Sequence, residues 1–81
     1  GQLSELRHLD LRDNRLTSLT GAVGGLGRLR VLDLRANRLT SLPEGLSGMS
    51  WLEKLDLRWN PMVDVPEPAL RLRRAGCVVL F

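Results

Sequence analysis

The chain has 81 residues, a formal net charge of +3, one histidine and one cysteine. This length fits one small domain, which buries a smaller share of its surface than a large domain does. No apolar run approaches the ~18 residues of a membrane-spanning helix, and the lone Cys77 excludes an intramolecular disulfide. The composition therefore predicts a single domain without a membrane segment in a reducing compartment, and we expect it to be cytoplasmic.

One eleven-residue phrase occurs three times, as LRHLDLRDNRL from Leu6, LRVLDLRANRL from Leu29 and LEKLDLRWNPM from Leu52. Each copy starts 23 residues after the previous one, and an internal repeat of this length decides the fold before local propensities do. This period divides residues 1–81 into a tail of a preceding repeat, three repeats and a partial closing unit. Their expected bounds are 1–5, 6–28, 29–51, 52–74 and 75–81.

The first half of each repeat alternates leucine with charge. In the first copy, Leu9 and Leu11 alternate with Asp10 and Arg12, and this period of two predicts a short strand with its leucines on one face. One such strand cannot bury its own leucines, so neighbouring repeats must stack to enclose a core. We therefore expect about four short parallel strands side by side.

An asparagine follows each strand where the chain must turn. Asn14, Asn37 and Asn60 are spaced by the repeat, and amide side chains at such turns can bond the loop backbone of adjacent repeats. We expect these three side chains to form a structural ladder.

The second halves of the repeats differ. Four glycines in 21–28 predict an irregular or barely helical return in the first repeat. In the second repeat Pro43 is suited to the first position of a short helix. In the third, Pro68 precedes the helix formers 69–74 and Gly76 can cap the end, so the longest helix is expected there.

Both ends of the chain interrupt the pattern. Counting forward by the repeat places Val78 and Leu80 inward and Val79 and Phe81 outward on a fourth strand. Counting backward places Leu3 at the last apolar position of a preceding repeat. Terminal repeats of a solenoid normally carry a polar outer face. We therefore expect either a piece of a longer solenoid or self-association through the uncapped N-terminal end.

The pattern L-x-x-L-x-L-x-x-N-x-L, followed by P-x-x-L-x-x-[LM], resembles the 23-residue, intracellular type of the leucine-rich repeat family over residues 3–81. The resemblance implies an α/β fold: a right-handed solenoid with a parallel concave sheet and loops or short helices on its convex side. The paired cysteines that cap extracellular members are missing. The family also implies protein partners such as signalling proteins, small GTPases or phosphatases.

On the concave face, outward residues should form three columns across the strands: His8, Val31 and Lys54; Asp10, Asp33 and Asp56; Arg12, Arg35 and Arg58. An arginine two residues from an aspartate on the same face can pair with it or with its neighbour on the next strand. Two interpretations stay open. Either the six charges neutralise one another, or the arginines present guanidinium groups to an acidic partner.

Two tryptophans stand outside the repeated framework. Trp59 occupies a position where the other copies carry Asp13 and Ala36, and Trp is enriched at interface hot spots. The alternative is that Trp59 packs over Pro61 or the closing unit. Trp51 is expected to be a partly buried wedge between turns. The candidate partner-binding residues are His8, Arg12, Val31, Arg35, Lys54, Arg58 and Trp59.

The residues offer little for catalysis. One histidine and one cysteine make no zinc set, and the glycines of 21–27 lack the Lys-Ser/Thr ending of a phosphate loop. Arginines beside the aspartate column oppose a metal site, so no cofactor is expected. The positive excess can be assigned to the last helix alone, which argues against a nucleic-acid partner.

These observations predict a non-catalytic protein–protein interaction module that binds its partner on the concave face. One alternative is the substrate-recognition segment of a larger enzyme, such as a ligase or kinase. Another is an engineered or minimal solenoid without a natural partner, although its irregular second halves are not what a designer would choose.

Overall fold

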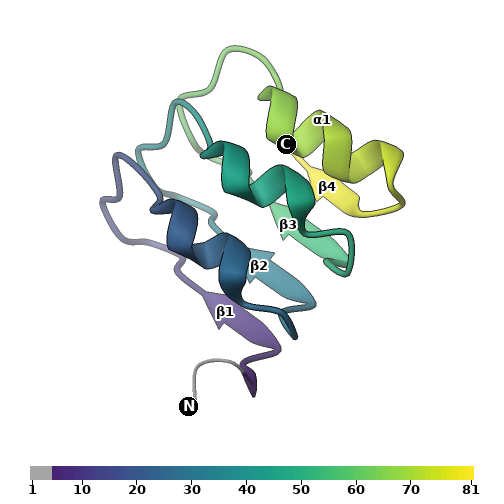
Figure 1. The fold of residues 1–81 in the computed structure, drawn as a ribbon. Coiled ribbons are helices and arrows are strands. Elements are labelled where there is room, and N and C mark those ends of the chain that lie inside the picture. The colour runs from purple at the N-terminus through teal and green to yellow at the C-terminus, as the bar shows by residue number, and fades with distance from the viewer. Residues whose placement is uncertain (1–4) are drawn as a thin grey trace.

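Four parallel strands form one sheet in the computed structural model, which describes residues 5–81 (Figure 1). They are β1 (His8–Asp10), β2 (Val31–Asp33), β3 (Lys54–Asp56) and β4 (Val78–Leu80), and they lie side by side in chain order. The predicted sheet of about four short parallel strands is confirmed. Leu3, with most of the expected tail of a preceding repeat, lies outside the described residues.

The return segments form a second layer beside the sheet (Figure 1). Two are 3-10 helices, η2 (Gly21–Gly25) and η3 (Glu44–Gly48), and the third is the α-helix α1 (Glu67–Arg74). The irregular return of the first repeat and the longest helix in the third were predicted. Pro43 was expected at the first helical position, but it is the N-cap, with an extended ψ of 147°.

The helix α1 has a defined start and stop. It begins at Glu67, and Pro68 lies in its first turn. Proline is tolerated there because the backbone N–H that it lacks would have no acceptor within the helix. At its end the Gly76 N–H donates to Arg73 O at 3.1 Å and the Cys77 N–H donates to Leu72 O at 3.0 Å. This Schellman motif requires a left-handed residue, and Gly76 has a φ of 104°. The predicted capping role of Gly76 is confirmed.

The orientation predicted for the fourth strand is wrong by one residue. Val31 pairs with Lys54, 23 positions on, whereas Lys54 pairs with Val78, 24 positions on. Val79 therefore stands beside the inward Leu55, and Val78 and Leu80 continue the outward columns. The third return is an α-helix closed by the Schellman turn and uses one residue more than the 3-10 returns, so counting by 23 misplaces β4.

The core lies between the sheet and the return segments. Leucines of the second and third repeats fill it, with Leu32, Leu34, Leu39 and Leu46 fully buried. The equivalent leucines of the first repeat pack against this cluster but stay partly exposed: Leu6, Leu9, Leu11 and Leu16. The core is thus most complete where a repeat has a neighbour on both sides.

Candidate functional site

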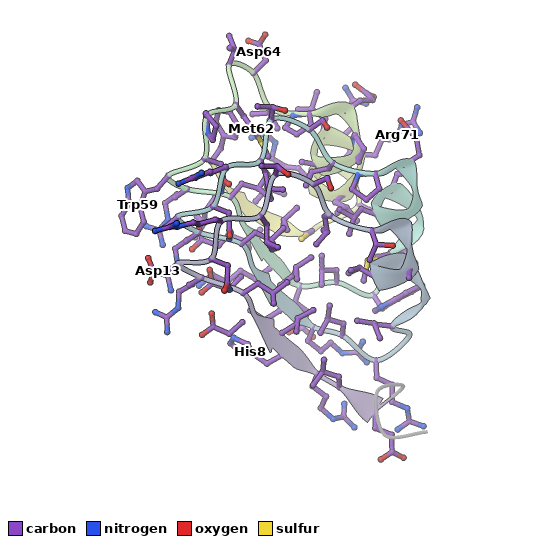
Figure 2. The ribbon with its side chains drawn as sticks, turned by 90° about the vertical axis from the view of Figure 1, so that its left-hand side faces the viewer. His8, Asp13, Trp59, Met62, Asp64 and Arg71 are labelled. Carbon is purple, nitrogen blue, oxygen red and sulfur yellow. The ribbon has the colours of Figure 1, made fainter. Side chains whose placement is uncertain are left out.

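The outer sheet face is the side of the sheet that points away from the return segments. Leu32 and Leu55 at the strand centres point into the core, so the residues flanking them point out. The register places His8, Val31, Lys54 and Val78 in one row and Asp10, Asp33, Asp56 and Leu80 in the next. Figure 2 shows Trp59 and Asp13 on the side of the molecule opposite Arg71 of α1.

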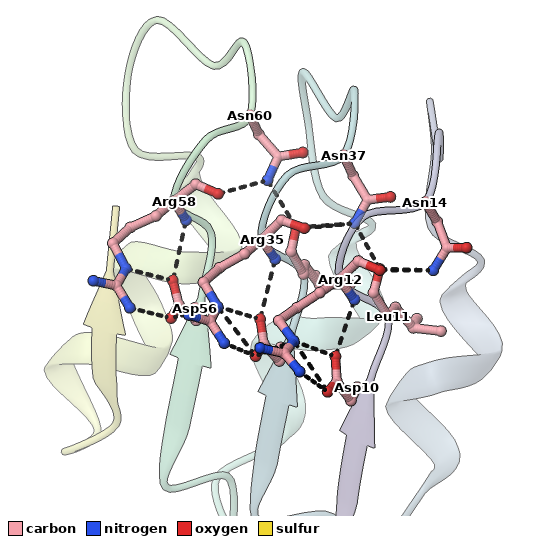
Figure 3. Close-up of polar contacts among 11 residues, drawn as sticks. Asp10, Leu11, Arg12, Asn14, Arg35, Asn37, Asp56, Arg58 and Asn60 are labelled. Atoms are coloured by element: carbon pink, nitrogen blue, oxygen red, sulfur yellow. Dashed lines mark hydrogen bonds and ion pairs between the residues drawn. The ribbon is translucent and has the colours of Figure 1, made fainter.

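Each arginine of the outer sheet face is paired with the aspartate two residues before it (Figure 3). The Arg35 Nη2 donates to Asp33 Oδ2 at 2.7 Å and its Nε to Asp33 Oδ1 at 2.9 Å. Arg58 makes the same two-point contact with Asp56, at 2.7 and 3.0 Å. Arg12 and Asp10 form the third pair, at 3.0 Å. This fork geometry suits a guanidinium facing a carboxylate.

The pairs are also linked from repeat to repeat. Arg12 Nε lies 3.7 Å from Asp33 Oδ2, and Arg35 Nε lies 3.4 Å from Asp56 Oδ2. Each of these arginines therefore bridges two aspartates. Asp33 and Asp56 are buried beneath them, at 7% and 2% relative exposure. The charges of the row largely neutralise one another.

The arginines hold the aspartates ionised. The side-chain hydrogen bond from Arg35 is the main cause that lowers the pKa of Asp33. Burial of Asp56 opposes its ionisation, but hydrogen bonds from the Arg58 side chain and backbone outweigh burial and keep the pKa of Asp56 below its usual range. The Arg12 N–H does the same for the pKa of the exposed Asp10. The row therefore keeps its charges near neutral pH.

The asparagines bond the turns of neighbouring repeats. Asn37 Nδ2 donates to Leu11 O at 2.9 Å, and its Oδ1 accepts from the Leu16 N–H at 3.1 Å. Asn60 makes the same two contacts one repeat further on, with Leu34 O and the Leu39 N–H. Within the described residues Asn14 bonds only carbonyls of its own repeat, and it is exposed. The amide contacts thus join the first repeat to the second and the second to the third.

Trp59 is 71% exposed, so it does not pack over Pro61 or the closing unit. Its neighbour Arg58 places Cζ 5.6 Å from the centre of the indole ring, within the range of a cation–π contact. The backbone of Trp59 is left-handed, with a φ of 65°, like Asp13 and Ala36 at the same position of the other repeats. This conformation was not foreseen from the sequence, because none of the three residues is a glycine.

Trp51 is half-buried and donates its indole N–H to Leu26 O at 3.1 Å. The hydrogen bond ties the second turn to the first, which confirms the wedge predicted for this residue.

Comparison with known proteins gives the family. The family model described as Leucine rich repeat matches residues 4–62. The chain belongs to the leucine-rich repeat family. It is also similar to the solved structure of a leucine-rich repeat protein from Leptospira interrogans, with 34% sequence identity and a TM-score of 0.83. That match covers 99% of this chain and 20% of the other, and no curated protein matches.

The predicted leucine-rich repeat solenoid is therefore confirmed. Leucine-rich repeats commonly serve as protein-interaction modules and are typically non-catalytic. Within residues 5–81 there is no pocket, no group of three metal-ligating side chains, and no helix long and apolar enough to cross a membrane. The candidate site in this leucine-rich repeat is thus a surface and not a cleft.

The structure brings together the predicted residues of this surface and adds two. Lys54 and His8 are exposed, and Val31 between them is half-buried. Val78 and Leu80 extend the two rows with apolar side chains, whereas counting by 23 had placed both of them inward. The sequence signal for the change in register was the longer helix expected over residues 69–74 with its cap at Gly76, because this return uses one residue more than the others.

Proposed function

We propose that this leucine-rich repeat domain is a non-catalytic protein-interaction module that binds its partner on the outer sheet face. The observation that carries the proposal is Trp59, a large aromatic side chain 71% exposed beside that face. The fold needs no aromatic residue there, because Asp13 and Ala36 adopt the same backbone conformation. Exposed Trp and Arg side chains are typical of binding hot spots.

The variation between repeats also supports binding at the outer sheet face. The inward leucines and the asparagines recur because the fold uses them. The first outward row instead reads His8, Val31, Lys54 and Val78, which combines an imidazole, an ammonium group and aliphatic side chains on one surface. Such a surface can discriminate between partners without any change in the scaffold.

The aspartate–arginine row has mainly a structural role in this proposal. Arg12 and Arg35 each contact two aspartates, so the charge of each guanidinium is compensated within the chain. Together with the aspartates they form a rigid and nearly neutral part of the binding face. Among the candidate residues, His8 and Lys54 make no ion pair within the described part of the chain, and Val31 and Trp59 carry no charge.

The chain spans one fifth of the length of the Leptospira protein chain that it resembles. A role as the recognition segment of a larger enzyme is compatible with the same binding face, since the catalytic domain would be separate. A cytoplasmic location is likewise proposed from the sequence, and the buried lone Cys77 fits it.

The test compares two surface variants that leave the ion pairs intact. Val31→Glu alters the centre of the outer sheet face, and Arg73→Glu alters an exposed residue of α1 in the return layer. In affinity capture followed by quantitative mass spectrometry, a partner retained by wild type and Arg73→Glu but lost from Val31→Glu supports the proposal. A partner lost only from Arg73→Glu places binding on the return layer and rejects it. Thermal melts confirm that both variants fold.

Self-association through the N-terminal end also stays a prediction. The partly exposed Leu6, Leu9 and Leu11 support it, because they form an apolar surface beside β1. Light scattering after size exclusion tests it: a mass that rises with concentration supports association, and a strict monomer at high concentration rejects it.

A further inference from the structure

We infer that the C-terminal half of the outer sheet face binds an extended protein segment carrying a carboxylate beside an aromatic or aliphatic side chain. This surface, the Arg58–Trp59 site, consists of Lys54, Arg58, Trp59, Val78 and Leu80. The inference rests on the proposed function and adds to it the chemical class of the partner.

The first argument is that the aspartate–arginine row has no fourth aspartate beside Arg58. Arg35 contacts Asp33 at 2.7 Å and also Asp56 of the next repeat at 3.4 Å, whereas Asp56 is the one carboxylate that Arg58 contacts within residues 5–81. The next aspartate position is occupied by Leu80 of β4. In Figure 3 the Arg58 guanidinium ends the row on the β4 side. Arg58 is therefore the arginine of the row with an unfilled place for a second carboxylate.

The exposure of Arg58 fits this role. Its side chain is 40% exposed at one end of the row, against 23% for Arg35 in the middle and 48% for Arg12 at the other end. Its Nε and Nη2 hold Asp56, and Nη1 donates to no other group of residues 5–81. A guanidinium has five N–H donors, so Arg58 can hold Asp56 and a partner's carboxylate together.

The second argument is the position of Trp59. A left-handed backbone disfavours bulky side chains and is tolerated best by Gly, Asn and Asp. Trp59 adopts it with a φ of 65° and gains little packing in return, since 71% of the residue stays exposed. Folding alone would favour a smaller residue. The Arg58 guanidinium over the ring holds an apolar surface directly beside the free donors.

The third argument is the character of the neighbouring surface. Val78 is 55% exposed beside Lys54, and Leu80 lies half-buried beside Asp56. Lys54 makes no ion pair within the described chain, so this end of the face combines apolar area with unpaired positive charge. An acidic side chain next to an apolar one complements both features.

A nucleic-acid partner fits the surface less well. Asp10, Asp33 and Asp56 run along the same face, and the arginines hold all three ionised. A chain of phosphates laid along the sheet would face these carboxylates, whereas a single carboxylate at Arg58 would not.

The probe is a phage-displayed library of random linear dodecapeptides, selected against the 81-residue chain. We expect enriched peptides to carry Asp or Glu beside Phe, Trp or Leu. Their affinity should fall about tenfold or more in Arg58→Gln and in Trp59→Ala, as at a binding hot spot. Trp59→Ala reproduces the residue that the second repeat carries at Ala36, so the backbone tolerates it. Arg73→Gln on α1 removes one exposed arginine from the return layer; it is the control and should leave affinity unchanged.

The outcomes separate the inference from the proposed function. Peptides lost in Val31→Glu but unaffected by Arg58→Gln and Trp59→Ala, or without an acidic preference, overturn the inference and leave the proposed function standing. Failure to select any peptide that Arg58→Gln and Trp59→Ala weaken overturns the inference, whereas the proposed function is rejected only by the affinity-capture comparison of Val31→Glu with Arg73→Glu. A fluorescent oligothymidylate that binds the wild type and not Trp59→Ala would overturn the inference in favour of single-stranded nucleic acid. An Asp-to-Asn change in an enriched peptide that leaves its affinity unaltered would also overturn it.

Discussion

The first and second repeats carry almost the same phrase in different surroundings. Leu32 and Leu34 of the second repeat are fully buried, whereas Leu9 and Leu11 of the first stay partly exposed. Asn37 is buried and bonds two repeats, whereas Asn14 is exposed and, in the part of the chain that the structure describes, bonds its own repeat alone. The same residue types thus contribute differently according to the number of neighbours, as expected for a solenoid whose stability resides in the contacts between repeats.

The largest difference between the two repeats should come from the core leucines. Leu32→Ala removes a fully buried side chain and should lower the free energy of unfolding by about 2–5 kcal/mol. Leu9→Ala should cost about half of that or less, because part of the side chain already faces water. Urea unfolding followed by circular dichroism measures both. Equal losses of unfolding free energy in the two variants would show that burial by neighbouring repeats does not determine how much a leucine stabilises the fold.

The asparagines should show a smaller difference. Asn37→Ala leaves the Leu16 N–H without its acceptor and should cost about 1–3 kcal/mol for each group left unpaired. Asn14→Ala should cost less, because Leu11 O still accepts from Asn37. Thermal melts compare the two variants, and an unchanged melting temperature for Asn37→Ala would count against the predicted ladder.

The contact between the first two returns can be tested at two adjacent glycines. A methyl group on Gly24 would lie 2.5 Å from Gly45 O, whereas one on Gly25 would meet nothing within 4 Å. Gly24→Ala should therefore cost about 1–2 kcal/mol, because the backbones of η2 and η3 must separate. Gly25→Ala should be neutral or slightly stabilising. A Gly24→Ala variant as stable as the Gly25→Ala control would contradict this close approach.

The smallest effect should appear on lowering the pH. The pKa values of Asp10, Asp33 and Asp56 are all lowered in the folded chain, so their contribution to stability is complete above the unfolded Asp pKa of about 3.9. It is lost as the pH falls through the folded pKa values. Stability should stay level from pH 7 to about 5 and then decline, and the decline should be shallower in Asp56→Asn. Urea titrations at several pH values measure it; stability that rises in acid would contradict the sign.

Much of the fold could be predicted from the sequence because the repeat fixes it. Alternation of Leu9 and Leu11 with charged residues identifies the strand, and the period places each strand beside the next. The pairing of arginine with aspartate was one of two interpretations that spacing allowed. Distances of 2.7 Å at Arg35 and Arg58 favour it, together with burial of Asp33 and Asp56 that charge alone would not suggest.

The remainder depends on backbone geometry that the period does not encode. The left-handed conformation at Trp59 is common to three unlike residues, none of them glycine, so composition gives no hint of it. The orientation of β4 depends on how many residues the third return uses between Leu57 and Val78. That number depends on the helix type and its cap, which the 23-residue period does not encode.

The change from 23 to 24 residues before β4 leaves the sheet undisturbed, since Lys54, Leu55 and Asp56 all keep partners in register. The return segment therefore accommodates the added residue. It forms an α-helix in place of a 3-10 turn, and the pairing of the strands stays the same. Insertions and deletions in such a solenoid can accumulate behind the sheet while the outer sheet face keeps its rows. The two layers can thus change separately, the returns in length and the face in chemistry.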